Sequence, residues 1–244
     1  MPVKPRTFYG IYCIALFVPL AISVLIVNLI LPGVRNRRSV ARHSSRVFLR
    51  AVGIPLTVIG LERLPDCPCV IVANHASYLD GLVVAAALPP DFAFVIKKEM
   101  VRVPVANLLL KRLGSEFVER FDRHKGAVDA RRVLKKAATG QSVVFFPEGT
   151  FTERRAIGKF HGGAFATAAR NKMPIVALAV RGTRDAMPSG TLWMRRMPVG
   201  VELLAIFDQS QADAPPASIL RQQTRALIAA AVGEDLHDDG VKPA

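Results

Sequence analysis

The sequence predicts an α/β protein: a mainly parallel β-sheet flanked by helices, preceded by an N-terminal membrane helix and a basic amphipathic helix. Beyond Pro55, short β-rich runs alternate with helical stretches, which is the pattern of a parallel sheet covered by helices. Before Pro55, residues 8–31 form a long apolar run without a charged residue. The 244 residues suffice for one globular domain of about 200 residues and an appendage.

The apolar run at 8–31 is long enough, at about 1.5 Å per residue, to cross a hydrocarbon core about 30 Å thick or to lie deep within it. A cleaved signal peptide is the alternative, because Lys4 and Arg6 precede the run. The apolar core of a signal peptide usually has only about 7–15 residues, and no small-residue cleavage site follows here. We therefore expect a retained anchor. The arginine-rich segment behind it predicts that the following domain faces the cytoplasm, on the inner membrane.

Residues 39–52 predict an amphipathic helix in which Arg42, Arg46 and Arg50 recur every four residues. This stripe allows two interpretations: a surface helix packed on the domain, or a helix at the headgroup level of a bilayer. Its position beside the anchor favours the second.

The charge of the chain points to an acidic partner. Lys and Arg number 33 against 19 for Asp and Glu, a net charge of +14, which suits nucleic acid, anionic lipid or a phosphorylated substrate. No zinc-finger spacing or RNA-recognition signature occurs, and much of the charge adjoins the anchor. We therefore expect an anionic membrane and no nucleic acid. Cys67 and Cys69 are spaced poorly for zinc and lack a second pair, so no metal site is expected.

Three units are expected: an anchor unit at 1–54, a globular domain at 55–233, and an acidic tail at 234–244 that frays. The expected strands are residues 56–61, 69–73, 92–96, 116–119, 142–146, 175–180 and 201–206. The expected helices of the domain are residues 79–88, 103–113, 124–138, 162–170 and 217–231. The nearly unbroken apolar runs VIVA and VVFF are typical of strands buried on both faces.

Asn74, His75 and Asp80 stand just beyond the strand at 69–73, where ligands gather in such sheets. On one continuous helix, a spacing of five residues would turn His75 and Asp80 away from each other. They can meet only if His75 lies in the loop and Asp80 in the first helical turn, for which Ser77 is a suitable N-cap. Asp80 would then orient the ring of His75 and leave its other nitrogen as a general base. The structural alternative is that the pair only caps the helix.

A second polar turn, Phe146-Pro147-Glu148-Gly149-Thr150, ends another apolar strand. Pro147 would stop the sheet ladder, and Gly149 would let a ligand approach the backbone. Thr150 and neighbouring N–H groups could hold a phosphate oxygen, and Lys159 could add positive charge. Taken alone, a Pro-Glu-Gly turn is more often a structural turn than part of a binding site. Its significance comes from its expected position on the same sheet.

Arg120 ends a short predicted strand, where its planar fork could bind a phosphate. The alternative is a solvated surface arginine on a very basic chain. No Gly-x-Ser-x-Gly elbow, typical of many hydrolases, occurs in the sequence.

Four segments, in this order, resemble the four blocks of the glycerolipid acyltransferases, and most closely those of the 1-acyl-glycerol-3-phosphate acyltransferase group. The segments are Asn74-His75-x4-Asp80, Gly114…Phe117-Val118-x-Arg120, Phe146-Pro147-Glu148-Gly149-Thr150 and Pro174-Ile175-Val176. Each block alone is weak evidence, but four in order at compatible spacing are specific. The resemblance covers about residues 55–207.

The resemblance implies a glycerol-3-phosphate acyltransferase-like α/β domain with an N-terminal membrane-binding helical pair. It implies that His75 is the general base and Asp80 its orienting partner. The acceptor-binding residues that it implies are Arg120, Glu148 and Gly149, with Thr150 beside them. No metal or redox cofactor is implied.

Two departures from the family's pattern concern the acceptor. The family often has an arginine after the threonine of its third block, where this sequence has Phe151. Glu116 and Glu119 stand close in sequence to Arg120 and could neutralise part of a phosphate site. Both bear on the identity of the acceptor more than on acyl transfer.

The function that the resemblance implies is transfer of a fatty acyl group from acyl-CoA or acyl carrier protein to the 2-hydroxyl of 1-acyl-glycerol 3-phosphate, giving phosphatidate. One alternative keeps the reaction and changes the acceptor to another lysolipid or a hydroxylated lipid. A second alternative is a non-catalytic protein that binds anionic membranes, which would make no demand on His75 or Asp80.

Overall fold

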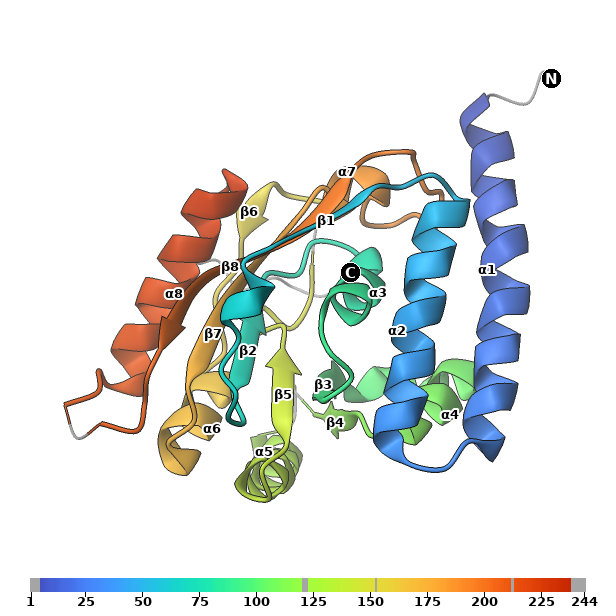
Figure 1. Cartoon of the computed structure of the whole chain (residues 1–244). Helices are drawn as coiled ribbons and strands as arrows, with labels where there is room; N and C mark the ends of the chain where they lie inside the picture. Colours follow the sequence, from blue (N-terminus) through green and yellow to red (C-terminus); the bar gives the residue numbers. More distant parts are fainter. Residues whose placement is uncertain (1–4, 120–122, 152, 212, 238–244) are drawn as a thin grey trace.

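A seven-stranded sheet in the order β1-β8-β7-β2-β5-β3-β4 forms the centre of the molecule (Figure 1). The computed structural model describes residues 5–119, 123–151, 153–211 and 213–237. The strands of the sheet are β1 Leu56–Ile59, β2 Val70–Ala73, β3 Phe92–Lys97, β4 Glu116–Val118, β5 Ser142–Phe145, β7 Ile175–Arg181 and β8 Val199–Phe207. All neighbouring pairs are parallel except β7 and β8, which confirms the predicted mainly parallel sheet.

The helices follow the predicted order along the chain. They are α1 Pro5–Ile30, α2 Val34–Ala51, α3 Leu79–Ala87, α4 Pro104–Arg112, α5 Arg123–Ala138, α6 Gly163–Asn171, α7 Thr183–Ala186 and α8 Ala217–Val232. Short elements that the sequence pattern did not predict are the helix α7, the 3-10 turns η1 Leu61–Arg63 and η2 Lys98–Arg102, and the strands β6 Ala156–Ile157 and β9 Asp235–Leu236. These short elements contain too few residues to show a hydrophobic period.

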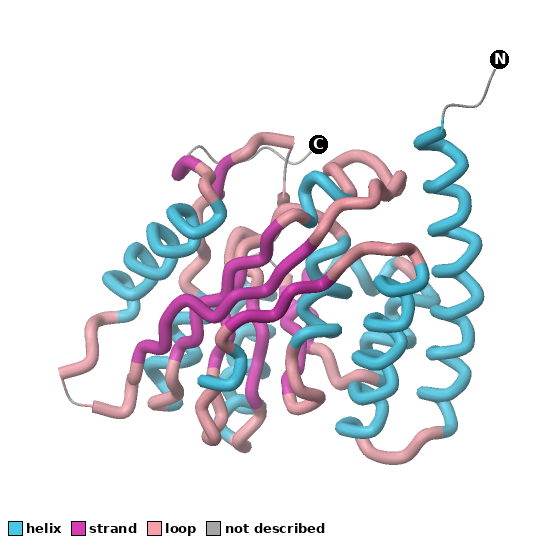
Figure 2. Tube along the Cα trace, turned by 45° about the horizontal axis from the view of Figure 1, so that its top comes forward, coloured by secondary structure: helices cyan, strands magenta, loops and turns pink. Residues whose placement is uncertain are grey.

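Helices cover both faces of the sheet, as Figures 1 and 2 show. α2 and α3 lie over one face, with α1 packed outside α2, and α5, α6 and α8 lie over the other. Along β2, Ile71 and Ala73 belong to the first core, whereas Val70 and Val72 belong to the second. Because both faces of this strand are buried, each of its residues must be apolar.

Helix α1 is fastened to the domain near both of its ends. The hydroxyl of Tyr9 donates a hydrogen bond to the carbonyl of Val52 (2.7 Å), and Arg112 of α4 donates one to the carbonyl of Asn28 (2.9 Å). The segment Thr7–Ile30 has a mean hydropathy of 2.7 and is long and apolar enough to cross a membrane.

The arginines of α2 face the domain more than expected. Arg38 is buried and donates to the carbonyl of Leu113 (2.9 Å), and Arg46 donates to the carbonyl of Ala86 (2.7 Å). These carbonyls lie at the C-terminal ends of α4 and α3, where helices leave carbonyls without intrahelical partners. The part of the stripe at Arg46 therefore packs on the domain, against our expectation of a headgroup-facing stripe. Arg50 stays exposed.

The acidic tail was expected to fray, and this is wrong for its first residues. Glu234 pairs with Arg184 at 2.9 Å, and both side chains are nearly buried. Strand β9 then pairs in parallel with β6. A buried, bidentate ion pair holds this end of the chain against the domain. Residues 238–244 lie outside the described part of the chain.

Candidate active site

Two of the predicted polar segments meet at one edge of the sheet. Strands β2 and β5 are parallel neighbours, so their carboxyl ends lie side by side. His75 follows the end of β2, and the turn Phe146-Pro147-Glu148-Gly149-Thr150 follows the end of β5. This edge is where parallel sheets place their ligands.

His75 and Asp80 form the pair that their spacing predicted. Nδ1 of His75 lies 2.9 Å from Oδ2 of Asp80. His75 lies in the loop, and Asp80 lies in the first turn of α3, which begins at Leu79. The hydroxyl of Ser77 accepts a hydrogen bond from the N–H of Leu79 (3.1 Å), so Ser77 serves the helix start as expected. With Nδ1 engaged, Nε2 is the ring nitrogen that this pair leaves for another partner.

The carboxylate of Asp80 is fully buried and fixed by its own loop. Its Oδ2 also accepts hydrogen bonds from the N–H groups of Ala76 (2.6 Å) and Ser77 (2.8 Å). Backbone donors of this kind hold the carboxylate in one orientation. The geometry therefore fits an aspartate that orients the imidazole and stabilises its protonated form.

Glu148 joins the loops around the site through its two carboxylate oxygens. Oε1 accepts a hydrogen bond from the N–H of His75 (2.7 Å), and Oε2 accepts one from the N–H of Gly158 (2.8 Å). Burial raises the pKa of Glu148 from 4.5 to about 7, although these two hydrogen bonds act in the opposite direction. These contacts give Glu148 a positioning role toward His75. A contact between Glu148 and the acceptor stays a prediction.

Asn74 has a different role from the expected one. Its Nδ2 donates to the carbonyl of Val180 (2.9 Å), and its Oδ1 accepts from the N–H of Val180 (2.7 Å). The side chain is only 2% exposed. Because the amide is occupied on both atoms, Asn74 clamps the ends of β2 and β7 instead of presenting a group to substrate.

Aromatic rings surround the imidazole of His75. Phe146 stacks on it with ring centroids 4.7 Å apart, and Phe151 meets it edge-on at 4.6 Å. Phe151 also contacts Tyr78. The side chain of His75 is 21% exposed, so one part of the ring stays open to solvent. Phe151, which occupies the position where the family often has arginine, is thus an apolar wall of the site.

The remaining residues that the sequence predicted for the site are Gly149, Thr150, Lys159 and Arg120. Gly149 has a φ of 80°, a backbone conformation that glycine adopts without strain. Thr150 and Lys159 are exposed near the site, Lys159 being next to the Glu148 partner Gly158. Arg120 lies outside the residues that the structure describes.

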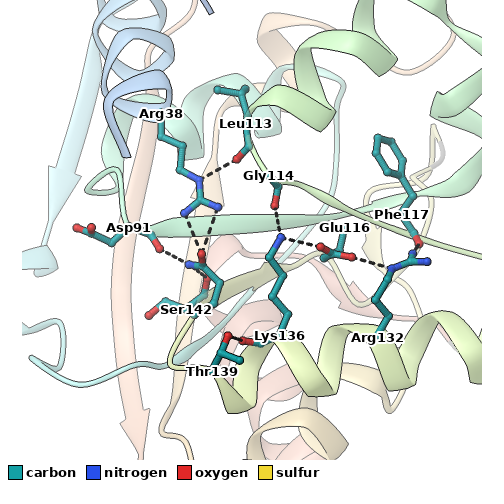
Figure 3. Close-up of polar contacts among 11 residues, drawn as sticks. Arg38, Asp91, Leu113, Gly114, Glu116, Phe117, Arg132, Lys136, Thr139 and Ser142 are labelled. Carbon is teal, nitrogen blue, oxygen red and sulfur yellow. Dashed lines mark hydrogen bonds and ion pairs between the residues drawn. The ribbon is translucent and has the colours of Figure 1, made fainter. Parts of the chain in front are cut away.

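Glu116 is neutralised by α5, as Figure 3 shows. Its carboxylate lies 2.7 Å from Nζ of Lys136 and 2.9 Å from Nε of Arg132. The Glu116 carboxylate is therefore paired with basic side chains of α5. This pairing removes one reason to expect that acidic side chains weaken a phosphate site.

Sequence reasoning missed Lys97, the last residue of β3. β3 is the other parallel neighbour of β5, so Lys97 reaches the same edge of the sheet as His75 and Glu148. It is half-buried and has no partner among the described residues. Its position directly after the apolar strand predicted at 92–96 was the signal that could have found it. A lysine at this edge is suited to bind a phosphate.

No group of three or more His, Cys, Asp and Glu side chains that could hold a metal ion occurs within the described ranges of the chain.

The model of the family named Acyltransferase matches residues 55–181, more than half of the chain and all of the site described above. This chain belongs to the acyltransferase family. The match begins just before β1 and ends with the last residue of β7, so it includes His75, Asp80 and Glu148.

Curated relatives of this acyltransferase carry closely related names. It is 35% identical, over 54% of its length, to a chloroplastic 1-acyl-sn-glycerol-3-phosphate acyltransferase of Brassica napus. It is 25% identical, over 84% of both chains, to the 1-acyl-sn-glycerol-3-phosphate acyltransferase of Neisseria gonorrhoeae. The match spans 39% of the Brassica protein and 54% of a relative from Chlamydomonas reinhardtii that is 30% identical.

The fold also matches a crystal structure. The 1-acyl-sn-glycerophosphate acyltransferase PlsC from Thermotoga maritima superposes with a TM-score of 0.74 over 93% of each chain, at 20% sequence identity. The agreement over nearly the whole chain includes the N-terminal helices as well as the sheet.

Proposed function

We propose that this acyltransferase moves a fatty acyl group from acyl-CoA or acyl carrier protein to the 2-hydroxyl of 1-acyl-glycerol 3-phosphate, giving phosphatidate. The observation that carries the proposal is the His75–Asp80 pair, joined at 2.9 Å at the ligand-binding edge of the sheet. Nε2 of His75 has no hydrogen-bond partner among the described residues. Relatives named for this reaction, one of them matched over 84% of its length, support the acceptor.

The His75–Asp80 pair explains how the acyl group passes directly from the donor thioester to the acceptor hydroxyl. Nε2 of His75 takes the proton of the acceptor hydroxyl while the hydroxyl oxygen attacks the thioester carbonyl carbon. The imidazolium that forms is stabilised by Asp80. The tetrahedral intermediate then breaks its C–S bond, and the thiolate that leaves receives the proton from His75. No enzyme nucleophile is required, because the acceptor supplies the attacking oxygen.

The phosphate of the acceptor requires basic groups near this pair. Lys97 at the end of β3 and Lys159 beside Gly158 are described candidates, and Arg120 is the candidate that the family resemblance adds. The apolar anchor α1 supports action at a membrane, which we propose to be the inner membrane with the domain on the cytoplasmic side.

The decisive variant is His75→Ala. We expect turnover to fall by about 10²–10⁴-fold, because the general base is removed. The matched control is His43→Ala, which changes an exposed histidine of α2 and should leave turnover unchanged. Circular dichroism would verify that both variants fold. Wild-type acyl transfer by folded His75→Ala would show that His75 is not the base, and absence of thioester cleavage in the wild type would favour a non-catalytic membrane-binding protein.

Phe151 favours a second candidate with the same chemistry and another acceptor, a different lysolipid or a hydroxylated lipid. Its ring touches His75 where an arginine often stands in the family, so the wall beside the base is apolar and uncharged. A mixed pool of lysolipids with one radiolabelled acyl donor would decide between the two. Phosphatidate as the dominant product supports the first candidate, and equal rates with non-phosphorylated acceptors support the second.

A further inference from the structure

A cavity away from His75 lies where α2 ends and β1 begins. Its volume is about 580 Å³. The charged side chains that line it are Arg46, Arg50 and Arg196, and the apolar ones include Leu49, Ile54 and Val58. No acidic side chain is part of the lining. Three guanidinium groups above an apolar wall are suited to an anion that carries hydrocarbon.

The arginines of this cavity keep most of their donors for a ligand. Arg46 uses Nε for the carbonyl of Ala86 (2.7 Å), and Arg196 uses Nε for the carbonyl of Gly53 (3.0 Å). Within the described part of the chain, the terminal amino groups of both have no partner, and Arg50 has none at all. A phosphate can accept several of these donors at once.

Among the described residues, the three positive charges also have no acidic partner. Burial, followed by the neighbouring charges of Arg42 and Arg50, lowers the pKa of Arg46. Like charges gathered in this way repel one another, so an anion between them relieves the repulsion.

Gly53 lies against the guanidinium of Arg196 and accepts a hydrogen bond from it. The φ of Gly53 is 69°, and a Cβ added there would lie 2.9 Å from Nε and 3.1 Å from Cζ of Arg196. The positive φ favours glycine at this position, and the guanidinium lies close to the backbone while its Nε bonds the Gly53 carbonyl. Arg196 is therefore held over the cavity and is not a free surface side chain.

The loop that supplies Arg196 is also apolar at its tip. Leu192 is 65% exposed and Trp193 is 46% exposed. The indole of Trp193 packs on α1 at Gly10, where an added Cβ would lie only 2.0 Å from the ring. Exposed tryptophan and leucine beside arginine are characteristic of segments at the boundary between lipid headgroups and acyl chains.

The cavity lies at the same edge of the sheet as His75. β1 is parallel to β8, β8 is antiparallel to β7, and β7 is parallel to β2. The first residue of β1 therefore lies at the edge where β2 ends. Three strand spacings, about 14 Å, separate these two strands across the sheet. A lipid in this cavity would not occupy the catalytic position but would be on the same side of the molecule.

We propose that this cavity binds the phosphate of an anionic membrane phospholipid, with its acyl chains against the apolar surface around Trp193 and the start of α1. The bound lipid holds the enzyme on acidic bilayers with the edge that carries His75 near the membrane. A soluble phosphate compound would use the arginines and leave this apolar surface unexplained. The lipid in this cavity is bound and not converted, so its binding does not depend on the identity of the acyl acceptor.

Trp193 provides a local probe, because it is the only tryptophan of the 244 residues. Purified full-length protein would be titrated, without acyl donor, with phosphatidylcholine vesicles that contain or lack phosphatidylglycerol. We expect a blue shift of the Trp193 emission that depends on the anionic lipid. In Arg50→Gln/Arg196→Gln, affinity for the anionic vesicles should fall about 30-fold, since each basic residue near the surface contributes about fivefold.

The charge-matched control is Arg131→Gln/Arg170→Gln, which removes two exposed arginines from α5 and α6. Its affinity should fall by about twofold or less. Equal losses in both double variants would overturn the site in favour of diffuse electrostatic attraction. Arg50→Lys/Arg196→Lys preserves charge and should still lose affinity, because lysine lacks the planar fork.

Two further titrations separate the possible phosphate sources. Inorganic phosphate and coenzyme A would be added in place of vesicles, with the same Trp193 readout. We expect neither to reproduce the shift. A saturable response to either one that requires Arg50 and Arg196, without a response to anionic vesicles, would overturn the lipid assignment.

Discussion

At the scale of single residues, the loop between β2 and α3 folds around one oxygen atom. Oδ2 of Asp80 accepts hydrogen bonds from the N–H groups of Ala76 and Ser77 and lies 2.9 Å from Nδ1 of His75. Oδ1 of Asp80 is buried and has no partner in the described part of the chain. His75 is thus the side chain that this carboxylate contacts within the described residues, and the ring is oriented before substrate binds.

Asp80→Asn tests the charge of this residue with little change of shape. We expect kcat to fall about 10²-fold or more with KM nearly unchanged, because the imidazolium loses its stabilising carboxylate only as it forms. Steady-state kinetics on the folded variant would measure both constants. Asp91→Asn, at an exposed aspartate paired with Arg35, is the control. An unchanged kcat in Asp80→Asn would show that the His75–Asp80 pair only caps α3.

Glu148 makes stability depend on pH. Its pKa is raised from 4.5 to about 7 by burial, so the protonated form favours the folded state below pH 4.5, and this contribution is lost as the pH rises through about 7. Glu148→Gln removes the titration. We therefore expect the stability of the variant, relative to wild type, to improve as the pH rises from 4.5 to above 7.

Urea unfolding across this pH range would measure the free-energy difference between Glu148→Gln and wild type. Glu153→Gln, at an exposed glutamate in the following segment, serves as the control. A difference that stays constant between pH 4.5 and pH 8 or falls with pH would contradict the raised pKa of Glu148.

The residues of the site differ in how far the sequence could predict them. His75 and Asp80 are five positions apart, and the loop-then-helix geometry follows from that spacing alone. Glu148 meets the backbone of His75 across 73 positions, and Asn74 meets Val180 across 106. Only the order of strands in the folded sheet brings such partners together, so composition and periodicity could mark these residues but not give their contacts.

At the scale of elements, the longer strands and helices were predictable because they combine a clear hydrophobic period with clear ends. The direction in which the arginines of α2 point could not be predicted in this way. Amphipathic reasoning places charge in solvent, whereas a guanidinium carries five donors and can satisfy carbonyls at the ends of neighbouring helices. Arg38 and Arg46 do so for α4 and α3.

Arg38 should therefore contribute more to stability than its neighbour Arg35. Arg38 is buried and donates to the carbonyl of Leu113 and to Oε1 of Gln141 (Figure 3). We expect Arg38→Met to cost about 1.5–3 kcal/mol of unfolding free energy, since these partners lose a charged donor. Among the described residues Arg35 pairs with Asp91 alone, and that ion pair is exposed, so Arg35→Met should leave the unfolding free energy nearly unchanged. Chemical denaturation in detergent would compare them, and equal costs would show that Arg38 is not a structural link.

At the scale of the whole molecule, α1 and the domain behave as one body. The hydroxyl of Tyr9 and the carbonyl of Asn28, near opposite ends of α1, are both bonded to the domain. α2 packs beside α1, where Tyr12 bonds the carbonyl of Ala51 and Phe17 contacts Phe48, and α1 exposes many large apolar side chains. They are Phe8, Ile11, Tyr12, Ile14, Phe17, Val18, Ile22, Ile26, Val27, Leu29 and Ile30. An upright, spanning α1 would draw the polar domain into the hydrocarbon, at a cost that buried charges make prohibitive.

We therefore expect α1 to lie along one membrane surface with its outer side in the lipid, and both ends of the chain to be on the same side. Epitope tags placed before Met1 and after Ala244 would report this in sealed inverted membrane vesicles, whose cytoplasmic face is outward. Added protease should remove both tags together, because the attachments at Tyr9 and Asn28 keep the start of α1 beside the domain. Protection of the N-terminal tag, with loss of the C-terminal one, would mean that α1 leaves the domain and crosses the bilayer. The contacts of Tyr9 with Val52 and of Arg112 with Asn28 would then have to break, and the domain would retain only α2 at its membrane side.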